Sequence, residues 1–105
     1  MMLWILPLLL LILFELIADI FSKQWALSGS WLMWIGAIAG YIIANVFWLF
    51  AIRDGSGLAR GAIIFSVGSA IGAVLLGVIL YKEVLAPIQI IGIGVGIISL
   101  ILIFS

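Results

Sequence analysis

The chain has 105 residues, of which 69% are hydrophobic and 8% are charged, and it contains neither His nor Cys. Soluble domains carry about a quarter charged residues, so this composition excludes a soluble globular enzyme. Four Lys or Arg balance four Asp or Glu, which leaves no basic face for nucleic acid. Because His and Cys are missing, we expect no metal site built from the usual ligands and no cofactor.

Four apolar segments predict an all-α integral membrane protein with a single four-helix domain over residues 1–105. A bilayer core of about 30 Å takes roughly 20 apolar residues per helix. The alternation typical of membrane β-strands is absent, so helices are the structure that satisfies the backbone in lipid. The predicted spans, in chain order, are residues 3–22, 31–52, 60–80 and 87–104.

The breaks between these spans carry turn signals. A short polar loop is expected over residues 23–30. Residues 53–57 predict a turn, because the two glycines there adopt positive φ readily. Residues 81–83 form the third break, and Pro87 suits the first turn of the last helix, where its missing N–H has no partner to lose.

The basic residues divide evenly between the two sides of the membrane. Four crossings put Lys23 and Lys82 opposite the termini, and Arg53 and Arg60 on the side of the termini. Orientation normally follows an excess of Lys and Arg on the cytoplasmic side, and two against two gives no excess. Either a weak bias from the amino terminus decides the orientation of the chain, or copies insert in both orientations and pair antiparallel.

Glu15 lies inside the first predicted span, at least one turn from either end. A charge near the bilayer centre costs about 2.5–3.5 kcal/mol, and such groups usually face inward and serve a function. A buried carboxyl group can exchange a proton for a cation, which is the chemistry of an antiporter. The structural alternative is a protonated Glu15 that only hydrogen-bonds to a neighbouring helix.

Asp19 and Lys23 follow Glu15 at intervals of four residues and therefore share its helix face. One interpretation makes Asp19 a second cation-binding or proton-relay group. The other, slightly favoured, is an Asp19–Lys23 ion pair at the interface, because Lys23 can extend toward water and take Asp19 with it.

Neutral polar residues also fall inside the predicted spans. Tyr41 is mid-span, so its hydroxyl requires a polar partner, for which Glu15 is the candidate. Asn45, Ser66 and Ser69 stand in apolar runs. They either line a cavity or hydrogen-bond between helices, two interpretations of equal weight.

Pairs of glycines four residues apart occur in three of the spans, and such spacings let helix backbones approach closely. These pairs are Gly36 and Gly40, Gly68 and Gly72, and Gly92 and Gly96. Four thin helices enclose little volume, so we expect at least a dimer. The first three spans would then line a shared cavity and the fourth would pack between copies.

The chain resembles the small multidrug resistance family of the drug/metabolite transporter superfamily over nearly its whole length. The shared features are the four spans, the glutamate within residues 14–17, Lys23 eight residues later, and Tyr41. Residues 72–74 and 77–83 are similar to span three and its exit loop in the guanidinium exporters of that family. Typical members carry a small neutral residue where this chain has Asp19, and a span-three tryptophan that is missing here.

The resemblance implies an antiparallel, dual-topology homodimer in a bacterial or archaeal inner membrane. The two copies of Glu15 would bind protons or a cationic substrate in alternation. The fourth span would pack between the copies through Gly92, Gly96 and Ser99.

The sequence therefore predicts a proton-coupled antiporter, not an enzyme, that exports small organic cations across the inner membrane. Its expected partners are protons, a small cationic substrate, membrane lipid and a second copy, with no nucleic acid. A lipid or lipid-carrier flippase without proton coupling, or a structural subunit that needs a partner chain, are the alternatives. The candidate proton- and substrate-binding residues are Glu15, Tyr41, Asn45, Ser66, Ser69 and Asp19.

Overall fold

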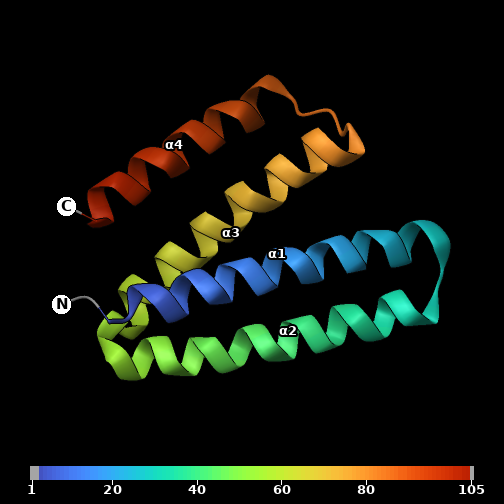
Figure 1. Ribbon diagram of the computed structural model, residues 1–105. Coiled ribbons are helices and arrows are strands. Elements are labelled where there is room, and N and C mark those ends of the chain that lie inside the picture. Colours follow the sequence, from blue (N-terminus) through green and yellow to red (C-terminus); the bar gives the residue numbers. More distant parts are fainter. Residues whose placement is uncertain (1–2, 105) are drawn as a thin grey trace.

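The structure is a computed structural model that describes residues 3–104, and these residues form an all-helical fold. The helices are α1 (Ile5–Ser28), α2 (Trp31–Ala51), α3 (Leu58–Tyr81) and α4 (Pro87–Phe104), with a short π-helical segment, η1 (Ile52–Ser56), continuing α2 (Figure 1). The predicted helical class is confirmed, and each predicted span corresponds to one helix.

Three of the helices are long and apolar enough to cross a membrane. Ile5–Ser28 and Leu58–Tyr81 each contain 24 residues, and α2 with η1 contains 26. At 1.5 Å per residue, 24 residues extend about 36 Å, more than the hydrocarbon core of a bilayer. The apolar part of α4, Pro87–Ile103, is shorter. The lengths and composition of these helices indicate a multi-pass membrane protein.

The first helix is longer than the sequence predicted. Residues 23–28, expected to be loop, continue α1, which ends at Gly29 with φ 71°. The N–H of Gly29 donates to the carbonyl of Trp25 at 2.7 Å, which closes the helix end. The prediction failed because it ended the helix where the apolar residues end. A helix instead continues until a residue such as glycine breaks it.

The other two breaks agree with the prediction. Gly55 and Gly57 adopt positive φ, 114° and 73°, in the turn between α2 and α3. Lys82 takes the left-handed conformation, φ 53°, and ends α3. Helix α4 begins at Pro87, and the side chain of Gln89 accepts a hydrogen bond from the N–H of Ala86 at 2.8 Å, which satisfies a donor at the helix start.

The helices alternate in direction, so the basic groups lie at two opposite ends. The start of α1 and the end of α4 lie at the same end of the molecule as the α2–α3 turn (Figure 1). At this end the guanidinium of Arg60 lies 4.4 Å from the ring centroid of Trp4 and donates to the carbonyls of Gly55 and Ser56. Lys23 lies at the other end, paired with Glu83. The predicted division of the basic residues is therefore present in the fold.

Helices α1 and α2 pack closely through small residues. A Cβ added to Gly40 would lie 2.9 Å from the Cβ of Ala18, and one added to Gly36 would lie 3.0 Å from the ring of Phe21. Ala18, Ala37 and Ala44 are buried along the same contact. The glycine spacing in span two thus serves packing within the chain.

Helix α3 packs on α1 through its own glycine pair, and α4 lies against α3 (Figure 1). A Cβ on Gly72 would come within 2.7 Å of the Leu16 side chain. Gly96 faces Val67 of α3, whereas a Cβ on Gly92 would meet nothing within 4 Å. The expected role of Gly92, Gly96 and the half-buried Ser99 in packing between copies stays a prediction.

The chain forms a slab rather than a closed bundle. Its principal extents are 43 × 34 × 16 Å, and large apolar side chains are exposed along every helix. Such a surface suits lipid or another apolar chain, because exposing it to water would be unfavourable.

Gly40→Ala should destabilise the chain relative to Gly94→Ala by about 1–3 kcal/mol. Both changes replace a mid-helix glycine and gain the same helix propensity. However, only the new Cβ at residue 40 meets Ala18, while a Cβ at Gly94 meets nothing within 4 Å. Equilibrium unfolding of both variants in detergent measures the difference. Equal unfolding free energies would contradict the close α1–α2 contact.

Candidate functional site

One face of α1 changes from apolar to polar halfway along the helix. Leu8 and Leu11 are buried, and Glu15 follows at helical spacing, half-buried between Leu11 and the buried Ala18. Asp19 continues this face one turn later. Among the described residues, Glu15 has no hydrogen-bond partner on a neighbouring helix.

Asp19, Tyr41 and Ser22 form a hydrogen-bonded group between α1 and α2. The Tyr41 hydroxyl donates to Oδ1 of Asp19 at 2.8 Å and lies 3.0 Å from Oγ of Ser22. The Ser22 hydroxyl also contacts the carbonyl of Ala18 at 2.8 Å. The partner predicted for Tyr41, Glu15, is therefore wrong. Gly40 packs against Ala18, and the long side chain of Tyr41 extends back toward the start of α2, which brings its hydroxyl to Asp19 rather than to Glu15.

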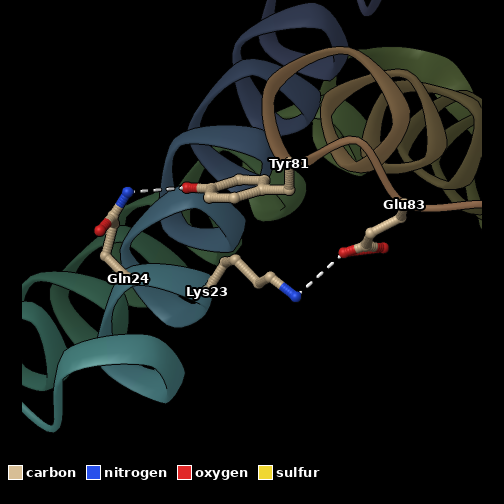
Figure 2. Close-up of polar contacts among 4 residues, drawn as sticks. All are labelled: Lys23, Gln24, Tyr81 and Glu83. Atoms are coloured by element: carbon tan, nitrogen blue, oxygen red, sulfur yellow. Dashed lines mark hydrogen bonds and ion pairs between the residues drawn. The ribbon is translucent and has the colours of Figure 1, made fainter.

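Lys23 pairs with Glu83 rather than with Asp19, contrary to the interpretation that the sequence slightly favoured. The ammonium of Lys23 lies 3.0 Å from a Glu83 carboxylate oxygen and 5.6 Å from the ring centroid of Tyr81 (Figure 2). Beside it, the side-chain amide of Gln24 donates to the Tyr81 hydroxyl at 3.0 Å (Figure 2). These two contacts join the end of α1 to the end of α3.

The chain path after α3 explains why Glu83 reaches Lys23. The left-handed conformation of Lys82 turns the backbone, and the N–H of Glu83 donates to the carbonyl of Gly77 at 3.0 Å. Gly77 leaves room for the carboxylate, because a Cβ there would lie 2.8 Å from Oε1 of Glu83. Sequence reasoning missed Glu83 and Tyr81 as partners of α1, and the only signal was their place at the third break.

A small cavity of about 90 Å³ lies between these groups. Asp19, Lys23, Tyr81 and Glu83 contribute its polar lining, and α3 contributes apolar side chains. The volume admits water but is far below the roughly 300–1,000 Å³ of drug-sized ligand pockets. The cavity joins Asp19 to the partly exposed Lys23–Glu83 pair.

The two largest grooves are open at the surface. One, about 490 Å³, runs along α2 past Tyr41 and Asn45, and the other, about 460 Å³, lies between α3 and α4 past Ser66. The Asn45 amide donates to the Tyr41 carbonyl at 2.8 Å, and the Ser69 hydroxyl donates to the Ser66 carbonyl at 3.5 Å. The candidate residues therefore fall into two groups, one in contact between helices and one bonded within single helices. The fold brings Asp19 and Tyr41 together, with Glu15 one turn away, but these bonds of Asn45 and Ser69 stay within their own helices.

The chain matches no family model, no curated protein and no solved structure. Within residues 3–104, no group of three or more Asp and Glu side chains is arranged to hold a metal ion.

The Lys23–Glu83 pair should contribute little to stability. Its side chains are 38% and 48% exposed, and exposed ion pairs are typically worth about 0–1 kcal/mol because solvent screens them. A double-mutant cycle with Lys23→Met and Glu83→Gln, read by equilibrium unfolding, measures the coupling free energy. A matched cycle with Lys23→Met and Asp19→Asn should give still less. A larger coupling free energy in the second cycle would mean that Lys23 pairs with Asp19 instead of Glu83.

Proposed function

We propose that the chain is a proton-coupled antiporter that exports small organic cations. The observation that supports this most directly is the pair of carboxyl groups, Glu15 and Asp19, one turn apart on the packed face of an apolar helix. Ionisable groups in such a position are costly and usually mark a proton or ion pathway. A soluble surface role does not account for them.

Coupling would follow from competition at Glu15. A carboxyl group holds either a proton or a cation, so binding of the substrate releases the proton and protonation releases the substrate. Glu15 fits this role better than Asp19, because Asp19 already accepts a hydrogen bond from Tyr41. Asp19 and Tyr41 would then adjust the site from one turn away.

The working unit would be an antiparallel homodimer. A slab 16 Å thick cannot surround a substrate and shield it from lipid. The open groove along α2, lined by Tyr41 and Asn45, would be closed by a second copy. Two Lys or Arg at each end of the fold favour neither orientation, so both would be present. The expected location is the inner membrane of a bacterium or archaeon.

A flippase for lipids or lipid carriers is the second candidate. The groove between α3 and α4 favours it, because a laterally open apolar groove of about 460 Å³ could admit an acyl or isoprenyl chain. Such an activity would need no proton coupling, so proton release separates the two functions.

Glu15→Gln should abolish proton release when a small organic cation is added to the detergent-solubilised dimer, because the amide cannot ionise. A screen of guanidinium compounds, polyamines and quaternary ammoniums, read by a pH electrode in weak buffer, identifies the cation. Asp54→Asn removes a carboxyl group from the α2–α3 turn and should leave the release unchanged.

Asp19→Asn should weaken the release without abolishing it. Release that survives Glu15→Gln but disappears in Asp19→Asn would move the coupling site one turn along α1. No release with any cation would favour the flippase.

Dual orientation is tested by cysteine labelling, since the chain has no Cys of its own. Ser28→Cys and Leu58→Cys mark the two ends at exposed positions. Each should be labelled from both sides of the membrane in comparable amounts. Asp54→Lys and Leu58→Lys add positive charge to the end of the fold that holds the α2–α3 turn, so this end should face the cytoplasm. Labelling of Ser28→Cys at the opposite end measures the change in orientation. A single orientation in the otherwise unmodified chain would exclude the antiparallel dimer.

A further inference from the structure

Three short oxygen–oxygen contacts run in sequence from α1 to α2 and back. Oδ1 of Asp19 lies 2.8 Å from the Tyr41 hydroxyl, that hydroxyl lies 3.0 Å from Oγ of Ser22, and Oγ of Ser22 lies 2.8 Å from the carbonyl oxygen of Ala18. We call these four groups the Asp19 chain. Every distance is within the range of an O–H···O hydrogen bond.

The hydroxyl groups cannot supply a hydrogen to all three contacts. Tyr41 and Ser22 carry one hydroxyl hydrogen each, and the carbonyl of Ala18 carries none. When Asp19 is protonated, it donates to Tyr41, Tyr41 donates to Ser22, and Ser22 donates to Ala18, so every contact contains a hydrogen. The third hydrogen is the acid proton of Asp19.

The ionised form is also satisfied. Tyr41 then donates to the carboxylate, as a charge-assisted hydrogen bond, and Ser22 turns to donate to Tyr41. The carbonyl of Ala18 then loses its hydrogen bond from the Ser22 hydroxyl. It keeps the helical hydrogen bond from the backbone N–H of residue 22. Neither form leaves a hydroxyl hydrogen without an acceptor, so a proton can come and go while the heavy atoms stay in place.

The charged and titratable groups around Asp19 lie on each neighbouring element. Glu15 is one turn away on α1, Tyr41 faces Asp19 from α2, and Tyr81 and Glu83 line the cavity from the end of α3. Lys23, the nearest cation on α1, is paired with Glu83. Among the described residues, no cation lies within ion-pair distance of Asp19. The cavity gives Asp19 a path for water toward the exposed end of the fold.

We propose that Asp19 is a second proton-binding site, distinct from Glu15, and that each protonation reverses the direction of the hydrogen bonds along the Asp19 chain. The carboxylate takes up one proton from the aqueous phase, the net charge rises by one, and the Tyr41 hydroxyl turns from Asp19 to Ser22. The use of this site in transport rests on the proposed function. There, the turn of the Tyr41 hydroxyl would make α2 respond to the charge near Glu15. The proton site itself exists without transport.

The test is carbon-13 NMR of the full chain in lipid bilayers, labelled at aspartate and tyrosine. Asp54→Asn and Tyr81→Phe leave one aspartate and one tyrosine in the chain, so each signal belongs to the Asp19 chain. As the pH rises, the Asp19 carboxyl carbon should change from acid to carboxylate in one step. The Tyr41 ring carbon that carries the hydroxyl should move in the same step.

Ser22→Ala separates the reversal from simple titration. Without an acceptor at residue 22, Tyr41 keeps donating to Asp19, so the Asp19 step should remain and the Tyr41 step should become clearly smaller. Ser28→Ala is the matched control, because the Ser28 hydroxyl also donates to a carbonyl four residues earlier, that of Gln24, but has no tyrosine contact. Both steps should persist in Ser28→Ala.

Three results would overturn the Asp19 site: a carboxyl carbon that stays in one form over the whole range in which the protein is folded, a Tyr41 signal that does not follow Asp19, or a Tyr41 step that is equally large in Ser22→Ala. Glu15→Gln should keep both steps while losing cation-induced proton release. Coupled steps in a chain that releases no protons to any cation would retain the Asp19 site and reject the antiporter.

Discussion

The close contact between Ala18 and Gly40 sets the level of every polar group that α1 shares with α2. A missing Cβ at residue 40 lets the two backbones approach. The side chain of Tyr41, which leans toward the start of α2, then reaches Asp19 and Ser22 with its hydroxyl. Hydrogen bonds of this kind require positions correct to a fraction of an ångström. Small residues along this contact therefore determine the chemistry of the site, although they take no part in it.

The other half of the fold is attached more loosely. Helix α3 reaches α1 through its glycine face and, at its end, through Lys23–Glu83 and Gln24–Tyr81. Both of these end contacts involve partly exposed side chains, so breaking them costs little free energy. The cavity beside Asp19 lies directly under them. Movement of the end of α3 would thus change access to Asp19 without disturbing the contact between α1 and α2.

Composition and local signals predicted the helices and most of their ends, because lipid leaves few backbone structures and glycine marks turns. The partners of Tyr41 and Lys23 could not be predicted in the same way. Tyr41 depends on how α1 and α2 slide past each other, and Lys23 depends on the left-handed conformation of Lys82, a residue that seldom adopts it. Local sequence rules identified Glu15 and Asp19 as unusual, but contacts between distant segments decide their surroundings.

The two-residue link Gly29–Ser30 has a consequence for the order of assembly. Only two residues join α1 to α2, so the two helices are neighbours in sequence as well as in space. Forming their contact therefore costs little loop entropy. A helical hairpin of this kind can form during synthesis, before α3 has left the ribosome. Asp19, Tyr41 and Ser22 meet within that hairpin, whereas Lys23 cannot pair with Glu83 until α3 and the turn after it have been made.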